Sequence, residues 1–464
     1  MNPKKMSRRD LLRAAGIGFL ATGSSLIAHP LFAQDPTATP LPLPQGSEGK
    51  LTVIHRTEYF EVVQQRFREL VVNFASANNV ELDISLANPE IFGDFTAKML
   101  AAVQAGNPPD LGYHQLSIQQ MYSLDLVEDV TDVVEQLIGL YGTPVPNLAE
   151  FNAKIDGRWW AVPFMSYTGA WFARKDKFEE KGIDVYSLDT WENRREACLE
   201  VSDPSNNFYG WGMTINRSGD GHGLISGVIQ SFGGTFVDES GFKVTFNSPE
   251  TVAAVEWLKE TYSSEKYRPM LPPGVESWTD TNNNEAYLAG TVGMTLNQPS
   301  VYAKAKADKN PVFEATAVLH APKWLDGSLP EAGGSGWITI FKGAPNVDLA
   351  KSLILELLAP ANYTPMVQNG GGLFLPAYSN LWTEDVMGAD ENFEVFREIL
   401  LNPDVFYGMS HPAPPNALVD QINAASITSQ MMANVTTGAM TSEEAVLDAH
   451  NKIVQIFEEG GAPQ

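Results

Sequence analysis

The most restrictive feature of this sequence is a strand, a helix and a second strand that follow one another directly. Residues 51–54 form a short apolar run suited to a buried strand. Apolar residues then recur at helical spacing from Phe60 to Phe74, and residues 80–86 alternate between apolar and polar as in a strand. Two strands joined by a helix in this way are parallel, and parallel strands belong to sheets covered by helices. The predicted fold class is therefore α/β.

Length and charge limit what such a fold can bind. The chain of 464 residues is longer than one hydrophobic core usually supports, so we expect at least two lobes. The formal net charge of -25 disfavours nucleic acid or an anionic membrane surface as a partner, because both require clustered Lys and Arg. A cationic ligand is compatible with this charge, although a high negative charge also keeps proteins soluble.

The N-terminus has the pattern of an export signal. Arg8 and Arg9 precede a weakly apolar run rich in Ala and Gly, which is typical of a twin-arginine signal peptide. We expect residues 1–33 to be removed, with cleavage near Ala33. Residues 34–49 are rich in Pro and Thr, and we expect them to form an extended linker.

Cysteine usage bears on the compartment and on the anchor. No cysteine follows the apolar run, so we expect an exported protein in a periplasm or equivalent cell-envelope space, without a lipid anchor through cysteine. The single cysteine, Cys198, excludes an internal disulfide and a multi-cysteine metal site. The fold must therefore be stabilised by burial of apolar side chains.

Several motifs occur in an order that resembles one family of exported receptors. Residues 92–100 read Phe-Gly-Asp-Phe-Thr-Ala-Lys-Met-Leu, and residues 105–111 read Ala-Gly-Asn-Pro-Pro-Asp-Leu. Similar segments lie at residues 156–163, 171–176, 232–234, 284–294 and 333–340. In this order the chain resembles extracellular solute-binding proteins of family 1, the carbohydrate-type receptors of ABC importers.

The resemblance implies a two-lobed periplasmic-binding-protein fold of type II, with hinge crossovers between the lobes. By position we place the first lobe at residues 50–162 plus 313–360, and the second lobe at residues 163–312 plus 361–464. The implied partners are a small polar ligand, expected to be a carbohydrate, and the permease subunits of the transporter. We expect a monomer that closes about its hinge when the ligand binds.

Aromatic side chains near predicted strand ends are the first candidates for ligand contact. Sugars present an apolar C–H face and a polar rim, so their receptors stack aromatic rings against the face. Trp278 lies in a polar loop, and Trp337 follows a glycine-rich segment whose backbone can approach a ligand closely. A position in a hydrophobic core is the alternative for each. The aromatic candidates are Trp160, Tyr167, Trp211, Trp278 and Trp337.

Polar candidates lie beside predicted strand ends as well. Ligands of α/β sheets bind at the carboxyl ends of the strands, which selects the loop containing Glu58 and Tyr59. His114 and Asn297 occupy similar positions after later strands. Glu58 could instead cap the helix that follows it, and His114 could be an ordinary core histidine.

Two other functions are compatible with parts of the sequence. A secreted glycoside hydrolase is also rich in Trp and carboxylates, but it needs two acids placed across the scissile bond. No Gly-x-Ser-x-Gly, His-Glu-x-x-His or phosphate-loop motif occurs in the chain. A receptor of the same fold could bind a cationic or zwitterionic solute through aromatic rings and carboxylates. We therefore expect a non-enzymatic receptor for a sugar or oligosaccharide, with no cofactor and no metal.

Overall fold

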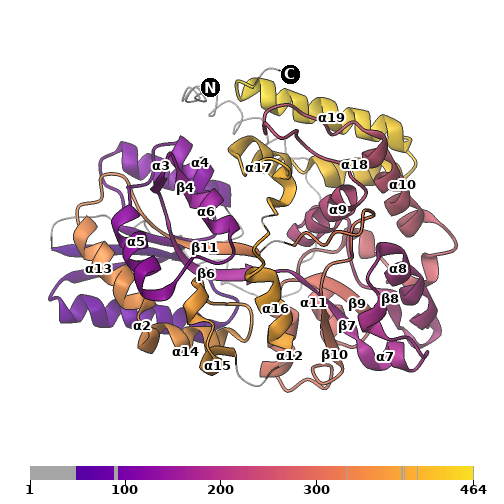
Figure 1. Cartoon of the computed structure of the whole chain (residues 1–464), viewed down its shortest axis with the longest axis horizontal. Coiled ribbons are helices and arrows are strands. Elements are labelled where there is room, and N and C mark those ends of the chain that lie inside the picture. Colours follow the sequence, from indigo (N-terminus) through magenta and orange to yellow (C-terminus); the bar gives the residue numbers. More distant parts are fainter. Residues whose placement is uncertain are drawn as a thin grey trace, which may run out of the picture.

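The computed structural model describes residues 49–87, 92–331, 333–387, 390, 392–404, 406–462 and 464. Within these residues the chain forms two α/β lobes, each with its own sheet and its own hydrophobic core (Figure 1). The predicted α/β fold with two lobes is thus confirmed. The predicted signal peptide at residues 1–33 and nearly all of the predicted linker at 34–49 lie outside the described residues.

The first lobe is built on a five-stranded sheet in the order β2-β1-β3-β11-β6. β1 is parallel to β2 and β3, whereas β11 is antiparallel to both β3 and β6. The strand, helix and strand predicted at the start of the chain are confirmed as β1, α2 and β2. The elements of this lobe are β1 (Lys50–Arg56), α2 (Glu61–Ala77), β2 (Glu81–Ala87), α3 (Phe92–Gln104), β3 (Leu111–His114), α4 (Ile118–Ser123), α5 (Thr131–Tyr141), α6 (Leu148–Ala153), β4 (Lys154–Ile155), β5 (Arg158–Trp159), β6 (Val162–Thr168), β11 (Gly333–Ile340), α13 (Val347–Leu358), α14 (Pro360–Gly370) and α15 (Glu384–Met387).

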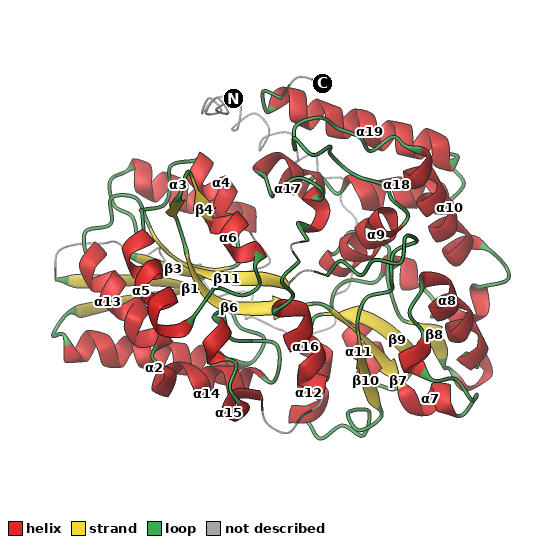
Figure 2. Cartoon of the chain, in the orientation of Figure 1, coloured by secondary structure: helices red, strands yellow, loops and turns green. Residues whose placement is uncertain are grey.

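The second lobe is built on a four-stranded sheet in the order β10-β7-β9-β8, with helices around it (Figure 2). On β7, Trp171 and Ala173 join one apolar cluster and Ala170 and Phe172 join another, which is the alternation expected of a strand buried on both faces. The elements of this lobe are β7 (Ala170–Arg174), α7 (Lys175–Glu179), α8 (Trp191–Val201), β8 (Tyr209–Trp211), α9 (Gly219–Ser231), α10 (Pro249–Ser263), α11 (Asn282–Leu288), β9 (Val292–Asn297), α12 (Ser300–Ala307), β10 (Thr316–Leu319), α16 (Asn392–Leu400), α17 (Ala417–Ala424), α18 (Ile427–Thr436) and α19 (Ser442–Glu459).

The lobe boundaries differ from those that we placed by position. β10 pairs with β7, so residues 316–319 lie in the second sheet and not with the first lobe. Conversely, Tyr363, Met366 and Val386 are buried in the core of the first lobe, where α14 packs against α2, although we placed residues 361–464 in the second lobe. The chain crosses between lobes after β6, after β10 and after α15. Pairing and burial, which act between distant residues, decide these boundaries.

One motif of the family resemblance has a structural role. The buried carboxylate of Asp110 accepts hydrogen bonds at 2.8 Å from the backbone N–H and the hydroxyl of Thr52 on β1, and one at 2.9 Å from the backbone N–H of Asn346. Asp110 therefore links the first strand to the start of α13. A buried carboxylate needs such partners, because burying an unpaired charge is costly.

The helix boundaries that rest on local motifs agree with the sequence. Ser248 caps α10 by accepting from the backbone N–H of Thr251, with Pro249 in the first turn. Thr441 and Glu444 form a reciprocal capping box at the start of α19. Asn346 precedes α13, but its side chain binds Asp110 and does not cap the helix.

Candidate ligand-binding site

One edge of the first sheet adjoins one edge of the second sheet at the point where the chain first crosses between the lobes. β1, β3 and β6 end at the same edge of the first sheet, since β11 is antiparallel to β3 and to β6. Only Gly169 separates β6 from β7, and Ala170 on β7 pairs with Asn297 at the end of β9. β8 is parallel to β9, so it ends at the same edge of the second sheet. We call these carboxyl ends of β1, β3, β6, β8 and β9 the facing edges.

Arg56 and Glu58 form a buried charged pair at the end of β1. The Arg56 Nε lies 3.5 Å from the Glu58 Oε1, and the two side chains are only 18% and 7% exposed. The hydroxyl of Tyr113 on β3 donates to the same carboxylate oxygen at 2.6 Å. Burial raises the pKa of Glu58 above its ordinary value, although Arg56 and the Tyr113 hydrogen bond oppose this rise. The predicted site residue Glu58 therefore lies at the facing edge, held by two neighbours.

Tyr167 on β6 lies beside Arg56 and Glu58, because the neighbouring strand β11 carries glycine opposite it. A Cβ atom on Gly334 would lie 2.2 Å from Cζ of Tyr167, and one on Gly336 would lie 2.4 Å from Cγ of Met165. We expected these glycines to let backbone approach a ligand, but they make room for the side chains of β6. Burial raises the pKa of Tyr167, and Arg56 lowers it, so both tyrosine and guanidinium belong to one cluster.

Asn297 is at the end of β9 on the opposite edge. Its side-chain amide donates to Oδ1 of Asn284 on α11, and its own Oδ1 accepts from the Ser300 hydroxyl at 3.3 Å. The amide of Asn284 also donates to Ser300 Oγ at 3.3 Å. Asn297 lies where the sequence placed it, in a polar network that orients the first turn of α12.

A pair of carboxyl groups lies beside the same end of β9. Asp220, in the first turn of α9, accepts a hydrogen bond at 2.7 Å from the amide of Asn283, which also lies 3.4 Å from the carbonyl oxygen of Leu296. Asp280 accepts from the backbone N–H groups of Gly219 and Asp220 at 3.1 and 2.9 Å. Burial, and then the charge of Asp280, raise the pKa of Asp220 to about 7.

Trp278 and Tyr59 both lie near these edges. The carbonyl oxygen of Trp278 accepts hydrogen bonds at 3.2 Å from Thr214 and Asn216, which follow β8, and its indole is half-buried between two apolar clusters. Burial raises the pKa of Tyr59, and Lys304 and Asp308 at the end of α12 also act on it. Tyr59 of the first lobe thus lies within electrostatic range of a helix of the second.

His114 and Trp337 occupy internal positions in the first lobe. Nδ1 of His114 accepts from the backbone N–H of Leu116 at 3.1 Å, and its Nε2 lies 3.0 Å from the Thr339 hydroxyl, so both ring nitrogens are engaged. Burial, followed by the charge of Arg56, lowers the pKa of His114 to about 3. Trp337 is 4% exposed in the same core. We expected both to contact the ligand, but the structure makes them core residues.

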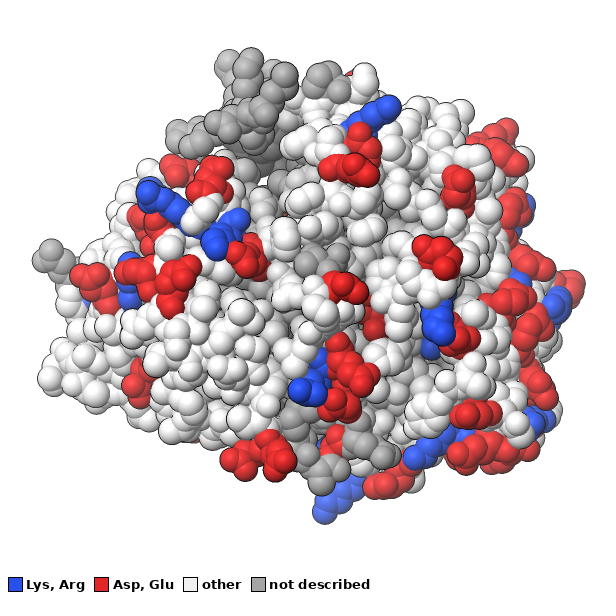
Figure 3. Space-filling view, in the orientation of Figure 1, with Lys and Arg blue, Asp and Glu red and all other residues white. Residues whose placement is uncertain are grey.

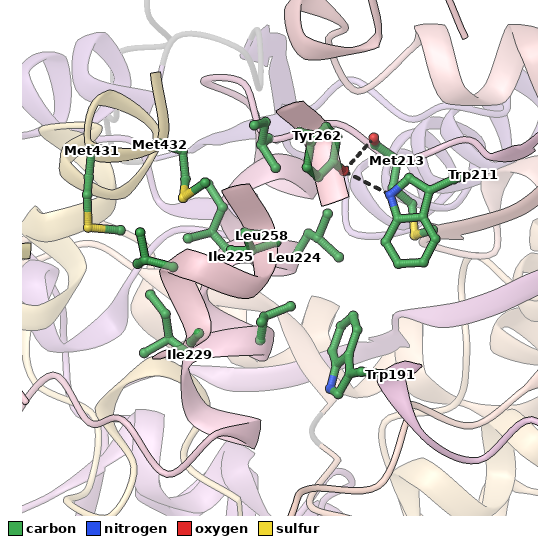
Figure 4. Packing of buried hydrophobic residues seen from close by; sticks show 14 of the residues in the cluster. Trp191, Trp211, Met213, Leu224, Ile225, Ile229, Leu258, Tyr262, Met431 and Met432 are labelled. Carbon is green, nitrogen blue, oxygen red and sulfur yellow. Dashed lines mark hydrogen bonds between the residues drawn. The ribbon is translucent and has the colours of Figure 1, made fainter. Parts of the chain in front are cut away.

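Trp211 and Trp160 are also engaged away from the facing edges. Trp211 is fully buried among Trp191, Leu258 and their neighbours, and its indole N–H donates to the Tyr262 hydroxyl at 3.0 Å (Figure 4). This burial corrects the expectation that Trp211 stacks on a ligand. The Trp160 ring lies in a tilted contact with Tyr122, with 4.8 Å between the ring centroids, and its indole N–H donates to the carbonyl oxygen of Ile155 within the first lobe.

Sequence reasoning missed Arg56 and Asp220. Arg56 belongs to the loop that we selected for Glu58, and its buried guanidinium Nη1 has no hydrogen-bond partner among the described residues. Asp220 lies in a glycine-rich run whose spacing does not fit a phosphate loop. The signal in both cases was a charged residue at a strand end or helix start, but its burial could not be seen in the sequence.

Within the described residues, no group of three or more His, Cys, Asp or Glu side chains is arranged to hold a metal ion. Among the same residues, no helix has the length and apolar character needed to cross a bilayer. On the face shown in Figure 3, acidic side chains are spread over both lobes with Lys and Arg among them.

Two lobes joined by crossing strands, with polar side chains on the facing edges, define a class of proteins that capture a small solute between lobes. The chain matches the family described as "bacterial extracellular solute-binding protein" over residues 69–394. It belongs to that family, whose members bind solutes and are not enzymes.

Individual relatives are similar at low identity. The arabinooligosaccharide-binding protein of Halalkalibacterium halodurans is 24% identical over 66% of this chain and 66% of its own length. The maltotriose-binding protein of Pyrococcus abyssi is 23% identical over 54% of this chain, and the match spans only 49% of that relative.

Solved structures confirm the fold. A solute-binding protein of Thermotoga lettingae bound with α-D-tagatose superposes with a TM-score of 0.71 at 19% identity, covering 88% of this chain and 99% of that one. The maltose-bound MalE3 of T. maritima gives 0.70 at 18% identity, covering 87% and 98%.

Proposed function

We propose that this protein is the extracytoplasmic receptor of an ABC importer, and that it captures a sugar or polyol between its lobes. The observation that carries the proposal is the meeting of polar side chains at the facing edges. Arg56 and Glu58 lie on the first edge, and Asn297 and Asp220 lie on or beside the second. A hydroxyl both donates and accepts hydrogen bonds, so a polyhydroxylated solute can pair with all of these groups.

The relatives support this class of ligand. Curated relatives are named for binding arabinooligosaccharide, maltotriose and mannitol, and similar solved structures hold tagatose, maltose and ribitol. In the proposed mechanism the ligand contacts both edges at once and therefore stabilises the closed arrangement, which the permease then recognises. Twin-arginine export through residues 1–33 is part of the same proposal, supported by Arg8 and Arg9.

A thermal-shift screen of the mature protein against sugars, polyols, polyamines and betaines tests the proposal. A ligand at a concentration of one hundred times its Kd stabilises the folded state by about 2.7 kcal/mol, which raises the Tm measurably. We expect shifts with sugars or polyols and none with polyamines or betaines. Shifts with cationic solutes alone would establish the alternative cargo.

Chromatography of the bound compound after prolonged incubation separates a receptor from a hydrolase. A receptor returns an oligosaccharide intact, whereas a glycoside hydrolase would release shorter products. Cleaved products would overturn the proposal.

A further inference from the structure

Arg56 is a buried cation whose Nη1 nitrogen lacks a partner among the described residues. Its Nε lies 3.4 Å from the carbonyl oxygen of Thr57 and 3.5 Å from the Glu58 carboxylate. Its Nη1 is shielded from solvent and has no hydrogen-bond partner among the residues that the structure describes. Buried N–H groups in folded proteins almost always find an acceptor. Nitrogens of Arg66, Arg194 and Arg195 also lack a partner among the described residues, but Arg56 lies at the facing edge, where a ligand oxygen can supply the acceptor.

The charge of Arg56 is already balanced within the first lobe. Glu58 is its nearest carboxylate, and the neighbouring Tyr113 and Tyr167 hydroxyls have pKa values raised by burial, so they stay neutral. Burial alone would lower the pKa of Arg56, but the charge of Glu58 opposes this effect, and the pKa of Arg56 is raised. The cluster therefore presents a fixed donor without a net positive charge.

The opposite edge does not attract an anion either. The Asp280 carboxylate accepts a hydrogen bond from the backbone N–H of Asp220 beside the end of β9, and Arg217 is an exposed cation in the same segment. Lys304 and Asp308, which lie near Tyr59, balance each other. Glu58 balances Arg56, Asp308 balances Lys304, and Asp280 lies in the same region as Arg217, so these groups together present no net positive charge to a carboxylate-bearing ligand.

We infer that Arg56 donates a hydrogen bond from Nη1 to a ligand oxygen, and that Glu58 neutralises Arg56 so that the site selects an uncharged polyhydroxylated solute over the corresponding sugar acid. This inference rests on the proposed function. Discrimination between two ligands needs repulsion of one as well as attraction of the other. Here the Glu58 carboxylate repels the carboxylate of a sugar acid.

Titration calorimetry with matched neutral and acidic probes tests the inference. The probe pairs are mannitol with mannonate and maltose with maltobionate, measured on the wild type and on Arg56→Lys, Arg56→Met and Glu58→Gln. We expect the wild type to bind the neutral member of a pair at least about tenfold more tightly. Both Arg56 variants should weaken binding of the neutral probe about tenfold or more, because a hydrogen bond from a charged donor is lost.

The Glu58→Gln variant is the most direct test of the proposed selectivity. It leaves Arg56 without its counter-charge, so the preference for the neutral probe should fall about tenfold or reverse. Glu69→Gln on α2, where the side chain is 63% exposed, is the matched control and should keep the wild-type ratio. Arg158→Met, at a side chain that is 64% exposed, is the control for the loss of an arginine.

The outcomes separate this inference from the function on which it rests. If no neutral probe binds the wild type and none from the wider sugar screen does, the proposed function fails and the inference fails with it. If neutral sugars bind but Arg56→Lys and Glu58→Gln keep wild-type affinity and ratio, only the inference is overturned. Arg56→Lys keeps the charge beside Glu58, so it remains informative if Arg56→Met does not fold.

Discussion

The Nδ1 of His320 lies 2.8 Å from Oε2 of Glu331, and this pair joins the two ends of the segment that connects β10 to β11. The Nε2 of the same ring lies 2.9 Å from Glu398 on α16. Arg194 donates to the carbonyl oxygen of His320, and the nearby Lys323 pairs with Asp189. The crossing from β10 to β11 is thus stabilised by the imidazole of His320, which lies between the carboxylates of Glu331 and Glu398.

We predict that His320 stabilises the fold in a pH-dependent manner. The hydrogen bond to Glu331 raises the pKa of His320 above its ordinary value of 6.5, although partial burial opposes this. Its contribution is therefore complete below pH 6.5 and disappears as the pH rises through the folded-state pKa. Because the ring is one-third exposed, we expect about 1 kcal/mol or less. Thermal unfolding of wild type and His320→Gln across this range should show the difference in Tm shrinking with pH; a constant difference would contradict the prediction.

Asp220 should make the folded state less stable as the pH rises, which is the opposite of the effect of an aspartate whose pKa is lowered by folding. Its pKa is raised from 3.8 to about 7, so the folded state holds a proton that the unfolded chain has released, and stability falls as the pH rises between these values. Asp220→Asn keeps an acceptor for Asn283 and removes the charge. We expect it to raise the Tm above neutral pH and to leave it unchanged near pH 4. An equal effect at both pH values would show that Asp220 is not protonated in the folded protein.

Substitution of Trp211 should mainly lower the stability of the fold, whereas substitution of Trp278 should mainly weaken ligand binding. Trp211→Ala empties a fully buried site and should cost about 3–5 kcal/mol of unfolding free energy. Trp278→Ala, at a half-buried ring beside the facing edge, should cost less stability and weaken sugar binding. Denaturant unfolding and calorimetry on each variant measure both quantities. Loss of affinity in a well-folded Trp211→Phe variant, with Trp278→Ala unchanged, would reverse these assignments.

Gly334 should be indispensable to the position of Tyr167. A Cβ atom there would lie 2.2 Å from the Tyr167 ring, so Gly334→Ala should displace the ring and lower both ligand affinity and stability. Gly139 on α5 has open space around it, so Gly139→Ala is the control and should stabilise the helix by about 0.5–1 kcal/mol. Similar behaviour of the two variants in calorimetry and thermal unfolding would show that Tyr167 does not depend on this contact.

About half of the candidate site could be predicted from sequence. Glu58, Tyr59 and Asn297 are at the facing edges because strand ends can be recognised locally and parallel strands end together. His114 follows the same rule, yet Thr339 and Leu116 occupy its ring nitrogens. A strand end predicts the neighbourhood of a residue, whereas the direction and the partners of its side chain depend on neighbours distant in sequence.

By itself, the sequence determined the α/β class and the boundaries capped by Ser248 and Thr441, because periodicity and capping act within a few residues. Only the tertiary structure decided that residues 316–319 join the second sheet and that Trp211 belongs to its core. It also decided that Arg56 is buried and that its Nη1 has no partner within the part of the chain that the structure describes. Strand pairing and burial are settled between segments far apart in the chain, and no local pattern records which of them meet.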